Sequence, residues 1–236
     1  MASYRGPRIA AWIIRFIAAL LVILLVSILL WRVFISANIP KSIDKMTPNA
    51  KLTEAYEASG GNLTFRYQEL PTISKAADSY GYFSVESCVF IPEADQVQLV
   101  FRYNNSTIRH LQEDYGLAEL PEKSLHLYDV SLVIASDPTP DVHEDDYGET
   151  NTLETRRILP TGTPLREETS LYTFYRYVFD GVEVEDVTNS IYLDVYYVDD
   201  IRYDERPYST LLLYAWDEEW KNYRPTKADW NAICGK

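Results

Sequence analysis

The chain has 236 residues, of which 47% are apolar, 14% aromatic and 24% charged, and this globular composition excludes a wholly disordered, collagen-like or coiled-coil protein. Its 22 Lys and Arg against 35 Asp and Glu give a formal net charge of −13, which repels phosphate backbones and disfavours a nucleic-acid binder. Four of the basic residues precede residue 33 and no acidic residue precedes Asp44, so the rest of the chain carries 18 basic against 35 acidic residues, a net −17. The sequence therefore has a basic head and an acidic body.

An apolar stretch at residues 16–31 has Ser27 as its only polar side chain. A helix that is apolar on every face favours lipid over a solvated bundle. Sixteen residues rise only about 24 Å, less than the roughly 30 Å of a hydrocarbon core, so the flanks must contribute. We predict a membrane-spanning helix over residues 12–34, with lipid as its partner. Its aromatic and basic flanks are expected at the two membrane interfaces: Trp12, Arg15, Trp31 and Arg32.

The orientation of this helix is predicted from its flanks. Three Arg and the free amino group precede the apolar stretch 16–31, and Arg32, Lys41 and Lys45 follow it, a narrow difference. A short tail before an apolar span is the usual layout of a signal anchor, so residues 1–11 are expected in the cytoplasm and the acidic body outside the cell membrane. The alternative is a signal peptide cleaved at residues 35–37, which the length of the apolar stretch disfavours.

Residues 35–61 are predicted to form a juxtamembrane stalk, since they are polar and end in two glycines. A short helix is expected within it, capped by Thr47 and ended by Gly60. Its small apolar face consists of Leu52, Ala55 and Tyr56. We interpret it as a spacer helix on the body or the bilayer, with a partner-binding helix as the alternative.

Beyond residue 62 the hydrophobic period changes to two, which is typical of half-buried strands. Six segments show this pattern: 80–91, 95–103, 124–136, 170–179, 190–198 and 208–216. Two weaker candidates are 63–67 and 152–159. The segment 208–216 is apolar on both faces, which predicts a central strand.

The alternation also predicts which side chains face the core. One buried face of the first segment is expected to hold Phe83, Val85, Val89 and Ile91. The next segment should turn Gln96 and Gln98 outward, and 190–198 should expose Tyr192 and Asp194. Five tyrosines are predicted on exposed faces: Tyr192, Tyr196, Tyr203, Tyr208 and Tyr214.

Strands of β-branched and aromatic residues without intervening amphipathic helices predict an all-β antiparallel sandwich over residues 62–236, immunoglobulin-like or of another Greek-key type. The Cys, Trp and Cys spacing of antibody domains is missing, so the prediction concerns architecture alone. A short crossover helix is expected at residues 106–117, and residues 137–168 form a long acidic connection.

No catalytic, cofactor or metal motif is present in the sequence. The nine glycines form no dinucleotide, P-loop or nucleophile-elbow pattern, and the three histidines lack metal-ligand spacing. The acidic connection lacks the order of a calcium loop, and chance carboxylate pairs are inevitable among 35 acidic residues. We therefore expect no enzyme activity, no cofactor and no metal.

Two features suggest a binding surface or a crosslink. The C-terminal tail concentrates aromatic residues that could stack on a ligand: Trp216, Trp220, Tyr223 and Trp230. Cys88 and Cys234 both lie on the exported side of the predicted topology, where they could form a disulfide or remain two thiols.

The sequence thus predicts a single-pass membrane protein with an extracytoplasmic β-sandwich that acts as a non-catalytic binding or structural module, with a protein or glycan partner outside the cell. The alternative is a carbohydrate-binding or glycan-processing envelope protein that uses exposed Tyr and Trp beside a carboxylate pair.

Overall fold

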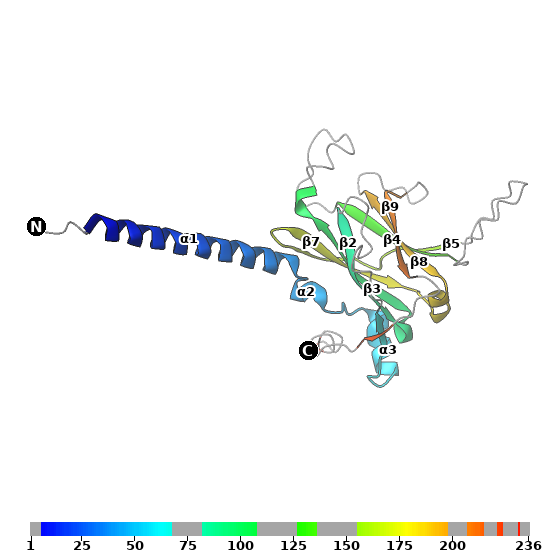
Figure 1. The fold of residues 1–236 in the computed structure, drawn as a ribbon. Coiled ribbons are helices and arrows are strands. Elements are labelled where there is room, and N and C mark those ends of the chain that lie inside the picture. The colour runs from blue at the N-terminus through cyan, green and yellow to red at the C-terminus, as the bar shows by residue number, and fades with distance from the viewer. Residues whose placement is uncertain are drawn as a thin grey trace, which may run out of the picture. The chain divides into compact units, whose positions relative to one another are not determined.

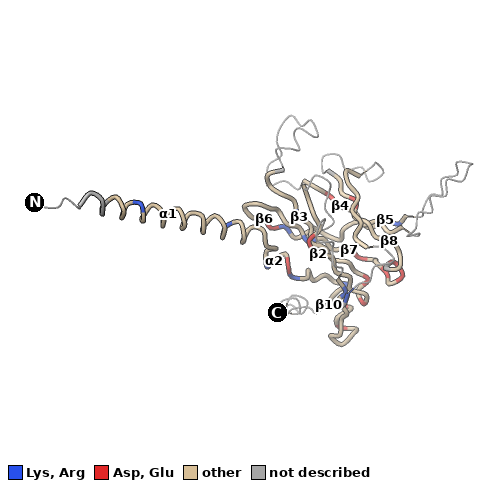
Figure 2. The backbone as a smooth tube through the Cα atoms, in the orientation of Figure 1, with Lys and Arg blue, Asp and Glu red and all other residues tan. Residues whose placement is uncertain are grey.

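The computed structural model describes residues 6–67, 82–107, 127–135, 155–197, 207–214, 221–223 and 231, and the statements below concern these residues. The chain divides into two compact units, Met1–Ile39 and Pro40–Lys236. The first unit is one helix and the second contains two β-sheets with short helices (Figure 1). Figure 2 shows basic but no acidic residues along the helix of the first unit.

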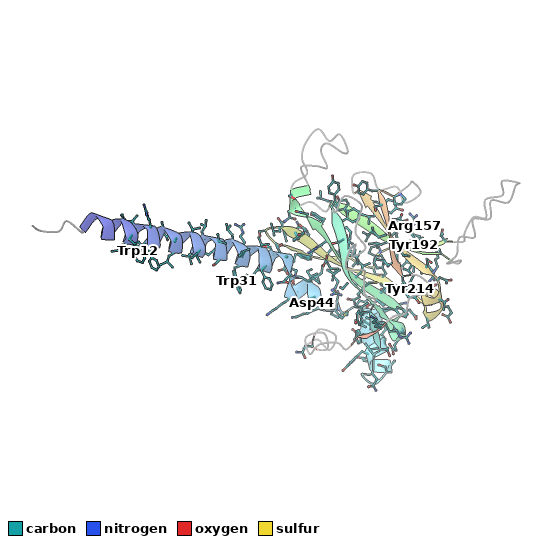
Figure 3. All side chains as sticks on the ribbon, viewed as in Figure 1. Trp12, Trp31, Asp44, Arg157, Tyr192 and Tyr214 are labelled. Atoms are coloured by element: carbon teal, nitrogen blue, oxygen red, sulfur yellow. The ribbon has the colours of Figure 1, made fainter. Side chains whose placement is uncertain are left out.

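Helix α1 (Gly6–Ala37) has 32 residues and contains the predicted span 12–34. Side chains from residue 11 to residue 35 are all exposed, including the four predicted interface residues Trp12, Arg15, Trp31 and Arg32. Figure 3 labels Trp12 and Trp31 on this helix. The polar Ser27 hydroxyl donates a hydrogen bond of 2.8 Å to the Ile23 carbonyl, so it presents no unsatisfied donor. Among the described residues, α1 is the helix long and apolar enough to cross a membrane.

The second unit contains two antiparallel sheets packed together, with strand orders β10-β1-β2-β3-β7-β6 and β5-β4-β8-β9. The strands are β1 (Phe65–Tyr67), β2 (Phe83–Ile91), β3 (Gln96–Asn104), β4 (Tyr128–Ala135), β5 (Thr155–Ile158), β6 (Leu165–Glu168), β7 (Tyr172–Asp180), β8 (Ser190–Tyr197), β9 (Ser209–Tyr214) and β10 (Lys221–Tyr223). The short helices are α2 (Lys41–Asp44) and α3 (Ala50–Ala58), with 3₁₀ turns at Pro92–Ala94, Asn105–Thr107 and Val184–Thr188. The two packed antiparallel sheets and the short helices before them confirm the coarse prediction, while the immunoglobulin-like or Greek-key type stays a prediction.

The core lies between the inner faces of the two sheets. Its side chains alternate along the strands as the period of two predicts, for example Tyr128, Val130, Leu132 and Ile134 on β4. One end of the core is aromatic, with ring centroids 5.1 to 6.2 Å apart in mostly edge-on pairs: Phe83, Phe101, Tyr103, Tyr128 and Tyr177. Such pairs add about 0.5–1.5 kcal/mol each beyond the area they bury.

Two predictions are wrong, one on the faces of β2 and one on the position of β9 in its sheet. A register shift between Val85 and Ser87 moves the following residues of β2 to the opposite face, so Cys88 joins the core between the sheets and Val89 packs on the outside. The strand predicted as central, β9, is the last strand of its sheet in the described chain, and its outward Leu212 is 46% exposed.

In the four-stranded sheet, three side chains predicted as exposed are buried. Asp194 is 6% exposed, Tyr196 3% and Tyr214 6%. Tyr192 and Tyr208 are half-buried, and Tyr203 lies outside the described residues. Asp194 and Tyr196 are buried because the outer face of β8 carries a polar network. Tyr214 lies on β9 and joins the core between the sheets, after a register shift in its pairing with β8.

Candidate functional site

Most of the predicted ligand-stacking residues lie outside the described chain. Trp216, Trp220 and Trp230 lie outside the described residues. The acidic residues 137–149 and the crossover segment 108–117 lie outside them as well. Tyr223 is placed on β10, in register with Phe65 of β1, so this part of the tail pairs with the edge of the six-stranded sheet. A stacking role for the four aromatics stays a prediction.

Cys88 is a buried free thiol, 1% exposed, in the core between the sheets. Burial raises the pKa of the Cys88 thiol to about 12, so it stays protonated and weakly nucleophilic at neutral pH. Cys234 lies outside the described residues, and the predicted bridge stays a prediction.

The segment at residues 40–49, called the strap below, crosses the outer face of the six-stranded sheet. Its first anchor is Arg176 of β7, which is 2% exposed. The Arg176 guanidinium donates through Nε to the carbonyl of Ile43 at 2.5 Å and through its second terminal nitrogen to the carbonyl of Asp44 at 2.9 Å. These carbonyls belong to the last two residues of α2, so a buried cation fixes the start of the strap.

The side-chain amide of Gln98 forms two hydrogen bonds with the backbone in the middle of the strap, as the backbone of a neighbouring strand would. Gln98 of β3 accepts from the Thr47 backbone N–H at 2.9 Å and donates to the Thr47 carbonyl at 2.9 Å. Its amide nitrogen also donates to the Gln96 side-chain oxygen at 2.7 Å. Gln96 and Gln98 are both 0% exposed, so the prediction that they face solvent is wrong because the strap covers them.

The end of the strap is fixed by Asn49, which caps α3. Its side-chain oxygen accepts from the Leu52 N–H at 2.9 Å and from the Gln96 amide at 3.0 Å, and its amide nitrogen reaches the Asp180 carboxylate at 3.1 Å. Asn49 rather than the predicted Thr47 is therefore the helix cap. The predicted helix itself is present, and its Leu52 is 0% exposed in a second core cluster with Phe65 of β1.

A polar network occupies the outer face of the four-stranded sheet around Asp194 of β8. The Thr210 hydroxyl donates to its carboxylate at 2.7 Å, and Arg157 lies 3.5 Å from the other carboxylate oxygen. Arg157 also donates to the Tyr196 hydroxyl at 2.7 Å. Burial and the neighbouring Asp194 raise the pKa of Tyr196. These groups satisfy one another, so we interpret the network as stabilising the sheet.

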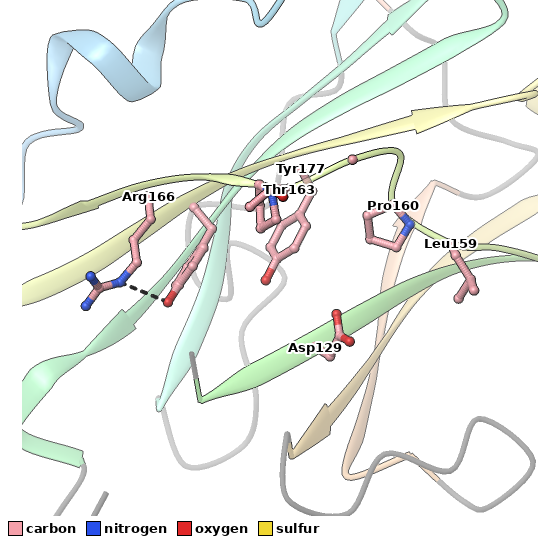
Figure 4. Close-up of a pocket in the computed structure, with 9 residues that line it drawn as sticks. Asp129, Leu159, Pro160, Thr163, Arg166 and Tyr177 are labelled. Carbon is pink, nitrogen blue, oxygen red and sulfur yellow. Dashed lines mark hydrogen bonds between the residues drawn. The ribbon is translucent and has the colours of Figure 1, made fainter. Parts of the chain in front are cut away.

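A pocket of about 530 Å³ opens where the chain passes from one sheet to the other (Figure 4). β5 belongs to the four-stranded sheet and β6 to the six-stranded sheet, so residues 159–164 cross between them. The pocket is lined by this crossover and by residues of three strands: Asp129, Leu159, Pro160, Gly162, Thr163, Pro164, Arg166, Tyr175 and Tyr177.

Tyr175 and Tyr177 line the bottom of the pocket, and one acidic residue, Asp129, and one basic residue, Arg166, line its rim. Tyr175 and Tyr177 are 2% and 1% exposed, so they offer no open ring face for stacking. Arg166 donates to the Tyr175 hydroxyl at 3.1 Å and lies 3.1 Å from the Glu168 carboxylate, which partly neutralises its charge. Burial and neighbouring Tyr103 raise the pKa of Tyr175, so this phenol stays neutral.

The crossover that forms the pocket wall is held in place by the chain itself. The Thr161 N–H donates to the Val178 carbonyl at 2.7 Å, and Gly162 adopts a positive φ of 71° that favours glycine. Pro160 and Pro164 fix two further backbone angles. The sequence predicted a long connection here but not the pocket, because only the change of sheet at residue 159 creates it.

No family model matches this chain, and neither the curated proteins nor the solved structures contain a match to it. Functional inference therefore depends on the residues described above.

Proposed function

We propose that this chain is a single-pass membrane protein, held by α1 with its N-terminus in the cytoplasm, whose β-sheet unit stands outside the cell membrane as a non-catalytic binding module. One observation carries the proposal. α1 exposes apolar side chains on every face, and only Asn38 and Ile39 separate its end from the compact unit. Two extended residues span at most about 7 Å, so lipid insertion of α1 holds the β-sheet unit beside the membrane.

The length of α1 supports an anchor over a cleaved signal peptide. Its uncharged apolar stretch, residues 16–31, has sixteen residues within a helix of 32, whereas the apolar region of a signal peptide typically has about 7 to 15. The strap also begins two residues after the end of α1, at Pro40. In an uncleaved chain, α1 is therefore connected to the β-sheet unit through the strap, which is hydrogen-bonded to the six-stranded sheet.

The pocket supports binding over catalysis. Within the described residues that line it there is one carboxylate, Asp129, and glycoside hydrolysis ordinarily requires two. The buried tyrosines also offer no stacking face for a sugar, so the pocket favours a protein partner over the glycan alternative. We further propose that the two sheets form a Greek-key sandwich, since each passage β3 to β4, β5 to β6 and β7 to β8 changes sheet.

Alkaline carbonate extraction of membranes tests the membrane assignment. The full chain is expected to stay in the pellet. Replacing Leu21 and Leu25 together by Asp places two charges in the apolar span, each costing about 2.5–3.5 kcal/mol, and should release the chain. Leu212→Asp on exposed β9 is the matched control and should leave the chain in the pellet. Release of the unaltered chain by carbonate would contradict the proposal.

A further inference from the structure

Three tripeptides of the chain have the Asn-X-Ser/Thr pattern of an N-glycosylation acceptor, with X other than Pro. They begin at Asn62, Asn104 and Asn105. All three belong to the β-sheet unit, which the proposed function places outside the cell membrane, and exported proteins carry such glycans on surface loops. The structure gives each of these asparagines a different environment, so it indicates which of them can carry a glycan.

The side chain of Asn105 is part of the packed fold. The residue is 7% exposed, its amide nitrogen donates to the Thr169 carbonyl at 2.9 Å, and its amide oxygen accepts from the Thr173 hydroxyl at 2.7 Å. A glycan is bulky and hydrated, so a glycan on this nitrogen requires the side chain to leave its buried position. Asn105 is therefore unsuited to carry one in the folded unit.

Asn104 is the last residue of β3 and is half-buried. Its backbone N–H donates to the Tyr82 carbonyl at 3.0 Å. Its side-chain oxygen accepts from the backbone N–H and from the hydroxyl of Ser106, both at 2.9 Å. Ser106 supplies the hydroxyl of this tripeptide, so the hydroxyl and the amide are bonded to each other and the backbone is held in the sheet. The folded unit therefore disfavours a glycan here as well.

Asn62 lies in an exposed turn that is neither helix nor strand. The turn follows α3, and its two glycines, Gly60 and Gly61, have positive φ angles of 62° and 83° that favour glycine. The Asn62 backbone N–H donates to the Ser59 carbonyl at 3.4 Å. Within the residues that the structure describes, the side-chain amide of Asn62 takes part in no hydrogen bond, so it is available to an enzyme.

The hydroxyl residue of this tripeptide, Thr64, faces outward like Asn62. Burial alternates along the segment, since Asn62 is exposed, Leu63 is buried in the second core cluster, Thr64 is half-buried and Phe65 is 1% exposed. The Thr64 backbone N–H donates to the exposed Glu93 carboxylate at 3.0 Å. Its hydroxyl makes no hydrogen bond to the described part of the chain. The amide and the hydroxyl of the pattern are thus accessible together only in the tripeptide at Asn62.

We propose that Asn62 is a site of N-linked glycosylation, with an oligosaccharide joined through diphosphate to a membrane lipid as the donor. The side-chain nitrogen of Asn62 forms a bond to the anomeric carbon of the first sugar. The bond from this carbon to the diphosphate oxygen breaks, the lipid diphosphate leaves with the electron pair, and the amide releases one proton to solvent. This inference rests on the proposed function, because the transfer takes place on the exported side of the membrane.

A glycan at Asn62 leaves the pocket accessible to a partner. The segment of Asn62 leads into β1, whereas the pocket lies beside β6. In the six-stranded sheet, β2, β3 and β7 separate these two strands. The proposed glycan therefore covers the α3 side of the unit and is compatible with binding at the pocket.

The test incubates the purified full chain, folded in detergent, with an oligosaccharyltransferase and its lipid-linked oligosaccharide, and locates the glycan by mass spectrometry. One glycan, on Asn62, is expected. Thr64→Ala should abolish it and Thr64→Ser should retain it, because the pattern requires the hydroxyl. Asn104→Gln is the matched control, since it removes an asparagine of the same pattern and should leave the glycan on Asn62 unchanged.

A second arm makes the full chain in sealed microsomes that contain the transferase. Thr161→Asn creates an Asn-Gly-Thr tripeptide in the exposed crossover and reports the orientation independently of Asn62. No glycan on Asn62 of the purified chain, or an equal amount on Asn105, would overturn the site and leave the proposed function standing. A glycan on the purified chain but on neither position in microsomes would contradict the proposed orientation, and the natural modification with it.

Discussion

Arg176→Met is expected to lower the free energy of unfolding of the β-sheet unit by about 3 kcal/mol. The substitution keeps an apolar stem in the buried site but removes the donors that bond the carbonyls of Ile43 and Asp44. Hydrogen bonds to charged groups contribute about 1.5–3 kcal/mol each, and buried carbonyls left without donors carry a desolvation cost. For a unit of this size, 3 kcal/mol corresponds to a fall in Tm of about 6–12 °C.

Thermal unfolding of the full chain in detergent, followed by tryptophan fluorescence, measures this effect. Arg166→Met is the matched control, because Arg166 lies on the neighbouring strand β6, on the face opposite the strap, and pairs with the partly exposed Glu168. It should lower Tm by a few degrees at most, as expected for a partly exposed pair. An equal fall in Tm for the two variants would show that the contacts between Arg176 and the strap do not add to the stability of the unit.

A chain that begins at Asn62 is expected not to fold, whereas one that begins at Ile39 is expected to fold. The shorter chain lacks Ile43, Met46 and Leu52, which are 0%, 3% and 0% exposed. Each contributes about 1.5–3 kcal/mol through burial, and their loss also uncovers the polar groups beneath the strap. The summed loss approaches the total stability of a typical domain, about 5–15 kcal/mol.

Circular dichroism and a cooperative urea transition of the two chains distinguish these outcomes. Ile43→Ala in the longer chain is a milder variant, expected to cost about 2–5 kcal/mol while leaving a folded protein. A cooperative transition of the Asn62 chain at the same midpoint as the Ile39 chain would show that the strap is a passive linker.

The sequence predicts this fold well wherever one local pattern decides the outcome. The apolar run of α1 has one physical requirement, which is burial in lipid. The alternation on β4 and β8 likewise has one, which is burial of every second side chain in the core. The face change within β2 could not be predicted in this way, because an extra residue at the bulge between Val85 and Ser87 reverses the pattern without any local signal.

The candidate sites were less predictable because each depends on contacts between distant segments. Gln98 and Arg176 look solvent-facing in their own strands, and only the strap, about 50 and 130 residues away in sequence, turns them into a buried clamp. The pocket likewise arises from a change of sheet between β5 and β6. A buried polar residue and an exposed one give the same alternating pattern, so periodicity alone cannot separate them.

Protease treatment of intact, sealed cells or right-side-out vesicles, followed by mass analysis of the membrane fraction, tests the central claim most directly. The account predicts that the 27.3 kDa chain is membrane-bound and uncleaved before treatment, and that protease leaves a short N-terminal fragment that contains α1. A soluble protein that begins near Asn38, or a chain that protease reaches only after the membrane is opened, would contradict it.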